Sequence, residues 1–288
     1  MNKFFLITVI VGGTSFFCLQ PVGRGGSVGR PAPGSQIAQQ IDIPGPLFGF
    51  GQNILNQNQF VVTNYFEAVE GFNDEFWAWD PGVLYGVTDR ASLLVQIPIL
   101  SAHSHLDRSR LIGLGDIIIQ GEYALYSQIG EDVRNQMTGI AAFIAPTAKV
   151  GVAGALDRPT SGFFLGSTVS HTSLRSYVYG ATGLLMSLKK NSVDYGNIFL
   201  FEMGLGLPIW YTDKSFLSIL FEFNGRYSSK DRVNDQLMIN GGARAFFGPI
   251  LHWVYKTFTF QIGFQQVVMQ RRFGQDPLDY RVGFFFSF

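Results

Sequence analysis

The chain has 288 residues, of which 47% are hydrophobic, 15% aromatic and 15% charged, and its 21 basic residues balance its 21 acidic ones. A net charge of zero argues against a protein that binds nucleic acid, because such proteins need a basic surface. The hydrophobic content excludes a chain that is disordered throughout. A single cysteine excludes a scaffold of intrachain disulfides.

The first residues have the pattern of a secretory signal peptide. Lys3 is followed by an apolar run at 4–11 and by a shorter one at 16–19. A membrane anchor is the alternative, but Gly and hydroxyl residues at 12–15 interrupt the run, which is also too short to span a bilayer. We therefore expect residues 1–22 to be a signal peptide and the protein to be exported. Cleavage would remove Cys18, and a mature chain without thiols suits an oxidising compartment.

Residues 23–58 form a separate segment that is rich in Gly, Pro and Gln. Such a composition does not sustain a helix or a β-ladder. Two interpretations stay open for this segment. It is either a flexible periplasmic leader or a plug that folds into the lumen of a barrel, because the apolar pairs at 47–48 and 54–55 could dock inside.

From residue 59 onward, apolar and polar side chains alternate with a period of two, which indicates strands whose two faces meet different surroundings. No apolar run is long enough for a spanning helix. Twelve strands are expected, and an even number allows a barrel to close. Their predicted limits are 59–70, 76–87, 91–101, 115–127, 137–148, 162–172, 175–187, 197–209, 215–228, 236–247, 257–268 and 279–288.

The predicted last strand has the most regular alternation. Its apolar face resembles the C-terminal signature that the barrel-assembly machinery of bacterial outer membranes recognises. This face consists of Tyr280, Val282, Phe284, Phe286 and Phe288. Connections predicted on the outer side are mostly longer and more charged than the inner ones, as in outer-membrane barrels. The inner connections at 128–136 and 248–256 are longer than this class usually has.

These patterns predict an all-β fold: a transmembrane, antiparallel, up-and-down β-barrel of about 12 strands over residues 59–288. Aromatic residues near the strand ends suit the interfacial girdles of such barrels. The predicted location is the bacterial outer membrane. The expected partners are outer-membrane lipid and the barrel-assembly machinery.

The polar face of the predicted strands carries charged residues in mid-strand, which suits a wet lumen better than a dry core. The set is Asp116, Glu122, Glu202, Glu222, Arg226, Arg244 and Arg281. Opposed charges in a pore orient and filter small solutes. The alternative is a structural network, because side chains can largely fill a barrel of this size. As a hypothesis, Glu222, Arg226 and Arg244 form a cluster that narrows the passage.

Short turn motifs recur from about residue 80 onward. They are Tyr85-Gly86-Val87-Thr88-Asp89-Arg90 with Leu93, Val95 and Pro98, Gly113-Leu114-Gly115-Asp116-Ile117, Gly121-Glu122-Tyr123, Pro146-Thr147 and Ser161-Gly162-Phe163. These stretches resemble a family of outer-membrane transport proteins that is named for the meta-pathway of phenol degradation. Ala148 departs from the family pattern, which has Gly there. The resemblance implies a barrel in the cell envelope and the uptake of aromatic compounds.

His171 and Ser173 are the best candidates for catalysis, because residues two apart share one strand face and a His can activate a hydroxyl. The pair resembles the His-x-Ser of outer-membrane phospholipase A. Leu174 and Arg175 replace the Asn and Gly that follow the Ser in that enzyme. The sequence offers no clear residue to orient the histidine, so the bland interpretation is an interfacial His beside a turn.

A metal site at His103, His105 and Asp107 lacks an evident fourth ligand. We therefore expect no enzyme, no cofactor, no metal and no nucleic-acid partner. The predicted function is a channel for the passive uptake of a small, hydrophobic or aromatic solute. A structural or adhesive barrel is the alternative, and a phospholipase-like hydrolase is a further one.

Overall fold

The computed structural model describes residues 47, 50–51, 53–71, 74–104, 110–130, 133–148, 160–173, 175–189, 192–212, 214–234, 236–238, 241–272 and 278–287. The predicted signal peptide at 1–22, most of the predicted leader or plug at 23–58, and Phe288 lie outside these residues. In the described part of the chain, no helix is long and apolar enough to cross a membrane.

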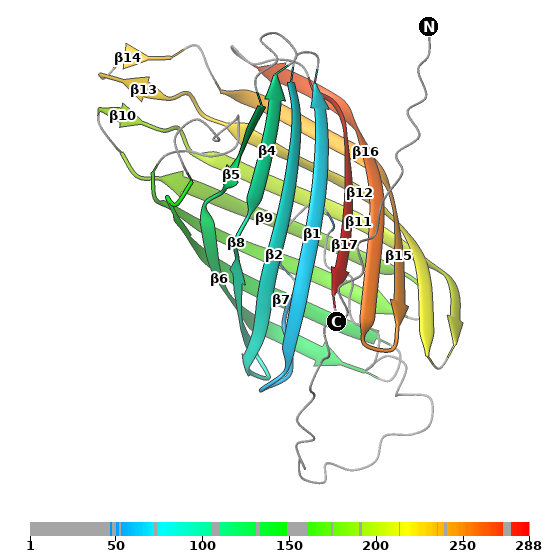
Figure 1. Cartoon of the computed structure of the whole chain (residues 1–288). Helices are drawn as coiled ribbons and strands as arrows, with labels where there is room; N and C mark the ends of the chain where they lie inside the picture. Colours follow the sequence, from blue (N-terminus) through cyan, green and yellow to red (C-terminus); the bar gives the residue numbers. More distant parts are fainter. Residues whose placement is uncertain are drawn as a thin grey trace, which may run out of the picture. The chain divides into compact units, whose positions relative to one another are not determined.

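The described chain folds into antiparallel strands that wrap into a barrel (Figure 1). In chain order the strands are β1 (Phe60–Gly71), β2 (Asp74–Thr88), β3 (Ala91–Gln96), β4 (Ile99–Ser104), β5 (Arg110–Leu114), β6 (Ile117–Ile129), β7 (Val133–Ala145), β8 (Gly162–Ser173), β9 (Tyr177–Ser187), β10 (Val193–Asp194), β11 (Ile198–Thr212), β12 (Ser215–Ser228), β13 (Arg232–Val233), β14 (Gln236–Leu237), β15 (Gly242–Tyr255), β16 (Phe258–Arg272) and β17 (Leu278–Ser287).

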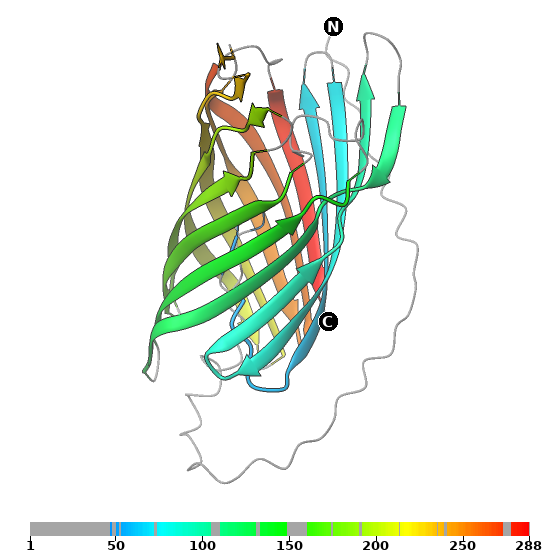
Figure 2. The same cartoon turned by 90° about the vertical axis from the view of Figure 1, so that its left-hand side faces the viewer.

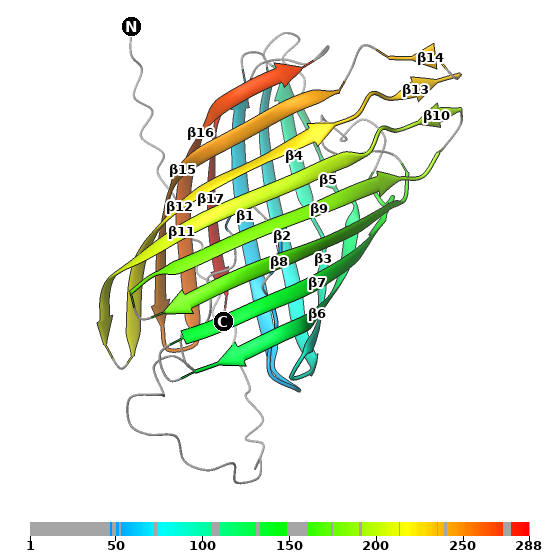
Figure 3. The same ribbon diagram turned by 180° about the vertical axis from the view of Figure 1, so that it is seen from behind.

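The barrel closes because β1 pairs with β17 on one side and with β2 on the other. Two of the wall strands are each split into two elements, since β3 and β4 both pair with β2, and β6 and β5 continue the wall beside them. When each split strand is counted once, the wall has the twelve strands that the sequence predicts. Strands β10, β13 and β14 form a separate small sheet (Figure 3).

Both splits fall at residues that break a ladder. Pro98 lacks an N–H, and the break that it makes is bridged by a hydrogen bond from the Gly115 amide to the Pro98 carbonyl at 2.7 Å. Beyond the break, the β4–β5 hairpin continues upward while β6 turns across the barrel (Figure 2). Within the described residues, the second edge of β5 pairs with no strand.

The largest error in the predicted strand limits lies around Pro249. The sequence predicts a strand at 236–247 and a connection at 248–256, whereas β15 covers Gly242–Tyr255. Pro249 fits inside the strand because the β15–β16 ladder has no register partner at 248–249, so no hydrogen bond of that ladder needs its missing N–H. Gly248 is required there, since a Cβ would lie 1.9 Å from the Phe264 carbonyl oxygen.

The other long inner connection is also shorter than predicted. β6 continues to Ile129 and β7 begins at Val133, so the expected connection at 128–136 shrinks to a tight turn. Short turns therefore follow β2, β6, β8, β11 and β15 at the end of the barrel where β17 finishes. Outer-membrane barrels have their short turns on the periplasmic side, and we call this end the periplasmic end.

The two faces of the wall differ as the alternation predicts. Large apolar side chains are exposed on the outer face, for example Met203 at 62% and Leu165 at 55%. On the last strand, Phe286 stacks on Phe66 and Tyr280 packs against the exposed Phe264, so these two members of the predicted assembly signal lie on the outer face. Recognition by the assembly machinery stays a prediction.

The inner face combines polar side chains with aromatic rings that lie over glycines. A Cβ on Gly204 would be 2.0 Å from a ring atom of Tyr179, so only glycine leaves room for this ring. In the same way, the ring of Phe164 lies over Gly183, where a Cβ would be 2.2 Å from it. The rings pack along the wall because their neighbours have no side chain, and they line the lumen with apolar surface.

Candidate functional site

The described residues that precede β1 lie inside the barrel (Figure 2), and their hydrogen bonds reach carboxylates on different sides of its wall. We call the described part of residues 47–58 the inner segment. It contacts β6, β7 and β8 on one side of the wall and β12 and β15 on another. None of its residues belongs to a strand of the wall, so side-chain contacts and single hydrogen bonds hold it in place.

Backbone amides of the inner segment donate to buried carboxylates of the wall. The Leu47 amide donates to Glu222 Oε1 at 2.8 Å, and the Phe50 amide to Glu202 Oε2 at 3.3 Å. Glu222 and Glu202 lie on the neighbouring strands β12 and β11. The Glu222 side chain is fully buried, and Glu202 is buried as well. A buried carboxylate oxygen that lost its donor would be left unpaired at a cost in free energy, so these carboxylates are effective anchors.

A third carboxylate holds the segment on the opposite wall. The Asn53 backbone amide donates to Glu122 Oε2 at 2.9 Å, and its side-chain amide donates to Glu122 Oε1 at 2.7 Å. Gln120 also donates to Glu122 Oε1, at 2.7 Å. Glu122 is thus fixed in one orientation, with both oxygens engaged. The inner segment therefore spans the lumen between β6 and β12.

Leu47 is the most buried apolar anchor of the inner segment. It is buried to 4% exposure in a cluster with four inward-facing residues of β9, β12 and β15. These residues are Tyr177, Tyr179, Leu220 and Ile250. Burial of a leucine side chain contributes about 1.5–3 kcal/mol. Leu47 is therefore held by both a carboxylate, through its amide, and an apolar recess, through its side chain.

Phe50 occupies a second apolar recess on β7 and β8. Its ring packs edge-to-face on Phe164, with ring centroids 4.7 Å apart, in a cluster that also contains Ile140. Gly51 follows with φ of +89°, a conformation that glycine adopts without strain. A Cβ on Gly51 would be 2.5 Å from Ile140 Cδ1 and 2.6 Å from Thr168 Cγ2. The segment therefore passes the wall here with no space for a side chain.

The inner segment leaves the lumen along the β2–β3 hairpin at the periplasmic end. The Leu55 amide donates to Ser92 Oγ at 2.8 Å, and the Gln57 amide to Asp89 Oδ1 at 2.9 Å. The Asn58 amide then donates to the Gly86 carbonyl at 2.8 Å. These contacts guide the chain directly into β1, which begins at Phe60.

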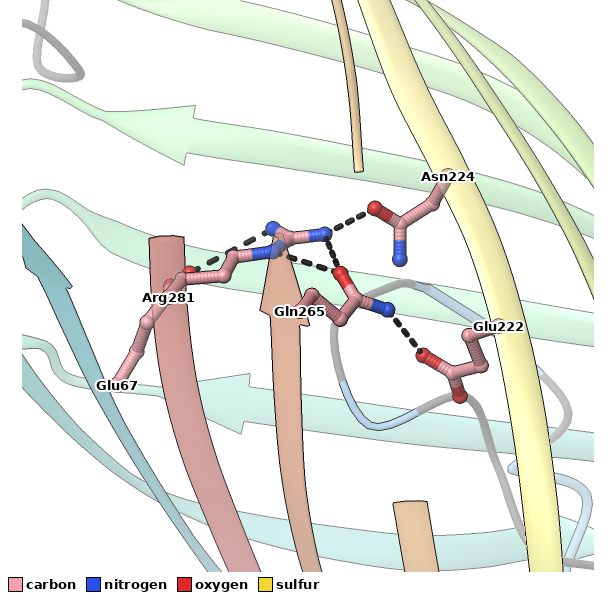
Figure 4. Close-up of polar contacts among 5 residues, drawn as sticks. All are labelled: Glu67, Glu222, Asn224, Gln265 and Arg281. Atoms are coloured by element: carbon pink, nitrogen blue, oxygen red, sulfur yellow. Dashed lines mark hydrogen bonds and ion pairs between the residues drawn. The ribbon is translucent and has the colours of Figure 1, made fainter. Parts of the chain in front are cut away.

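A polar network connects the anchor of Leu47 to β1 (Figure 4). The second oxygen of Glu222 accepts from Gln265 Nε2 at 3.4 Å. Gln265 Oε1 in turn accepts from Arg281, at 2.8 Å from Nε and 2.6 Å from Nη2. The guanidinium also donates to Asn224 Oδ1 and forms an ion pair with Glu67 at 3.5 Å. One arginine therefore joins β1, β12, β16 and β17 through their inner faces.

The seven ionisable residues that the sequence selects have different positions. Glu122, Glu202 and Glu222 each contact the inner segment, and Arg281 reaches Glu222 through Gln265. The remaining three are Asp116, Arg226 and Arg244. Arg226 and Arg244 are opposite each other in the β12–β15 ladder. Asp116 is buried at the break between β5 and β6, where it accepts from the Ala148 amide at 2.9 Å.

Sequence reasoning missed the anchors that are not charged. Leu47 and Phe50 lie in the segment for which docking was only one of two interpretations, and Gln265 and Asn224 were not among the selected residues. Glu67 was missed as well, although it alternates with apolar neighbours on β1. The alternation predicts that Gln265, Asn224 and Glu67 face the lumen. Their contacts with Arg281 depend on the register between strands, which the sequence does not show.

The histidine of the candidate hydrolase has an orienting group that the sequence did not reveal. His171 Nδ1 is 2.7 Å from Asn135 Oδ1, and the two residues are register partners in the β7–β8 ladder. The Ser173 hydroxyl instead interacts with the following turn, donating to the Ser176 carbonyl at 3.1 Å and accepting from the Ser176 amide at 3.1 Å. The geometry thus has a His–Asn pair but no Ser–His hydrogen bond.

The candidate metal site is only partly described. His103 is on β4, whereas His105 and Asp107 lie outside the described residues. Among the residues that the structure covers, no group of three or more His, Cys, Asp or Glu side chains could hold a metal ion.

Comparison with known proteins gives similarity in fold. No protein-family model matches the chain, and no curated protein matches it. Among solved structures, it is similar to the COG4313 outer membrane channel from Pseudomonas putida F1, with a TM-score of 0.65 and 10% identity over 83% of this chain and 98% of that one. LpxR from Salmonella typhimurium has a TM-score of 0.48, with 10% identity over 78% of this chain and 99% of that one.

The NanC porin has a TM-score of 0.44, with 10% identity over 78% of this chain and 98% of that one. At these identities the similarities concern the fold alone. A closed barrel with an apolar outer face is a form in which strands cross a membrane. The chain is a twelve-stranded antiparallel β-barrel of the outer-membrane type, which agrees with the predicted location.

Proposed function

We propose that the protein is an outer-membrane channel for the passive uptake of a small solute, and that the inner segment closes its lumen at rest. The observation that carries this proposal is the course of the inner segment, which crosses the lumen from Glu122 on β6 to Glu222 on β12. A barrel with only a structural role needs no separate chain across its interior. This favours the plug over the flexible leader for the described part of residues 23–58.

The way in which the segment is attached supports a closure that can open. Its amides donate to side chains of the wall, and its two apolar anchors, Leu47 and Phe50, occupy recesses on the inner face. Removing it breaks no hydrogen bond between wall strands. Each hydrogen bond contributes only about 0.5–1.5 kcal/mol net, so the attachment is a sum of small contributions, and a solute or a partner that makes the same contacts can replace them.

The predicted constriction residues have two roles in this proposal. Glu122, Glu202 and Glu222 hold the segment when the lumen is closed and present negative charge to the passage when it is open. Side-chain charges that line a pore set its ion preference. Arg226, Arg244 and Arg281 supply the opposite charge, and Asp116 fixes the base of an outer connection.

The inner face favours a solute with an apolar part. Once Leu47 and Phe50 leave, the recesses around Leu220 and Phe164 face the passage with aliphatic and aromatic surface. A small hydrophobic or aromatic molecule therefore suits the lumen better than a sugar does.

The test compares conductance with the closure intact and with it strained. Gly51→Val puts a side chain at a positive φ and against Ile140, so we expect it to displace the inner segment and to raise single-channel conductance and liposome swelling. Gly121→Val is the matched control, because a Cβ there meets only the Ala141 carbonyl oxygen, at 3.9 Å. Equal low conductance of folded wild type and Gly51→Val contradicts the proposal.

One observation favours a structural or adhesive barrel as the second candidate. The small sheet of β10, β13 and β14 lies outside the barrel wall, and Leu237 on β14 is 60% exposed. Such an appendage could contact another surface. Binding of cells or envelope components that is lost on deletion of residues 231–238, together with no solute flux in any variant, supports this candidate.

A further inference from the structure

We infer that the wall surface which holds the inner segment, here called the seat, is itself a binding site for solute, and that its ligand is an apolar peptide or a peptide-like amide. The inference rests on the proposed function, because a solute reaches the seat only when the segment leaves. The structure gives the chemistry of the ligand through the chain that occupies the seat. That chemistry has three parts: N–H acceptors, apolar recesses and an unpaired donor.

The N–H acceptors are placed for the amides of a peptide backbone. The amides of Leu47, Phe50 and Asn53 recur every third residue, and each meets a different buried carboxylate. These acceptors come from three strands, β12, β11 and β6. A ligand without N–H groups would leave buried carboxylate oxygens without these bonds, which costs free energy. The seat therefore discriminates against pure hydrocarbons.

Two apolar recesses accompany these acceptors. The Leu47 recess is lined by Leu220 and Ile250, and the Phe50 recess ends on the ring of Phe164. They receive side chains that are three residues apart, so a peptide with aliphatic and aromatic residues at that spacing fits both. Gly51 lies beside the second recess with no space for a Cβ, which requires a small residue directly after the aromatic one.

An unpaired donor distinguishes this seat from a simple cluster of acids. Asn224 is 4% exposed, and its Oδ1 accepts from Arg281. Its Nδ2 has no hydrogen-bond partner within the described residues, and Figure 4 shows this nitrogen pointing away from Arg281. Asn224 is the register partner of Glu202, the acceptor of the Phe50 amide. The described residues of the inner segment leave this donor unpaired, so a ligand carbonyl oxygen that reaches it adds a hydrogen bond which those residues do not make.

The experiment uses the full-length Gly51→Val protein, whose seat we expect to be free, and a synthetic peptide with the sequence of residues 45–55, acetylated and amidated at its ends. We expect the peptide to block conductance. Replacement of its two anchors (Leu47→Ser and Phe50→Ser) removes both apolar contacts, and we expect about hundredfold weaker block. In the channel, adding Glu202→Gln replaces one of the two carboxylate oxygens by an amide nitrogen that cannot accept, and we expect about tenfold weaker block.

A second measurement keeps the test decisive if Gly51→Val does not conduct. Anisotropy of the fluorescently labelled peptide reports binding to detergent-solubilised Gly51→Val and Phe50→Ala proteins, with heat-modifiable mobility as the control for folding. Saturable binding that weakens with the two serines supports the seat even without flux. In that case the proposed channel function fails while the binding site stands.

Two results overturn the inference. One is a conducting Gly51→Val channel that the peptide neither blocks nor binds, which leaves the channel function intact. The other is block by phenethylamine and hexylamine, but not by the acetylated peptide, because the seat would then recognise an ammonium charge and not the N–H groups of an amide.

Discussion

Leu47 is the most buried apolar anchor of the inner segment, and Leu47→Ala removes most of its apolar contact with Leu220 and Ile250. Truncation of a buried leucine costs about 2–5 kcal/mol in a protein core. The recess can partly relax around the shorter alanine side chain, so we expect the closed state to lose about 2–3 kcal/mol. The equilibrium between closed and open lumen should then shift by about 30- to 150-fold towards open.

The assay is the open probability of single channels in planar bilayers, recorded for wild type and Leu47→Ala under the same salt. Leu205→Ala is the matched control, because Leu205 is exposed on the outer face of β11 and has no contact with the lumen. We expect the control to behave like wild type. An unchanged open probability in correctly folded Leu47→Ala would refute the role of this anchor in closure.

Three other predictions concern the polar network and the candidate hydrolase. Glu222→Gln replaces the carboxylate that accepts from the Leu47 amide by a neutral side chain. We therefore expect a higher open probability and a lower cation-to-anion permeability ratio, read from reversal potentials. Arg281→Met leaves Glu67 without this ion pair, and we expect about 2–4 kcal/mol lower stability, measured by urea titration of barrel unfolding in lipid vesicles. Because the Ser173 hydroxyl interacts with its turn, we expect equal, background release of fatty acid from phospholipid by wild type and Ser173→Ala, and activity that disappears in Ser173→Ala would contradict this.

The strand number and the two faces of the wall were predictable, because a period of two reports directly which side of a strand meets lipid. The end of β15 was not, since Gly248 and Pro249 are ordinarily signals for a turn. Their place inside the strand depends on a local gap in the β15–β16 ladder. Such a gap is a property of the pairing between two strands, and no local pattern encodes it.

The candidate site was predictable only in part. Glu122, Glu202 and Glu222 were assigned to the lumen from their parity. The docking of Leu47 was not, because its segment has no periodicity and its partners come from strands that follow it by more than a hundred residues. Asn135 was missed for a different reason, because it reaches His171 only through the register of β7 and β8.

The most direct test of the closure links the inner segment to the wall with a disulfide bond that can be reduced. Leu47→Cys and Leu220→Cys place two thiols in one cluster. The Gly51→Val background weakens the attachment of the inner segment, so that the segment leaves the lumen when no disulfide holds it. We predict low conductance in the oxidised protein and a large, reversible increase after reduction, with no such response when either cysteine is alone. Equal conductance before and after reduction, with the disulfide verified by mass spectrometry, would contradict closure of the lumen by the inner segment.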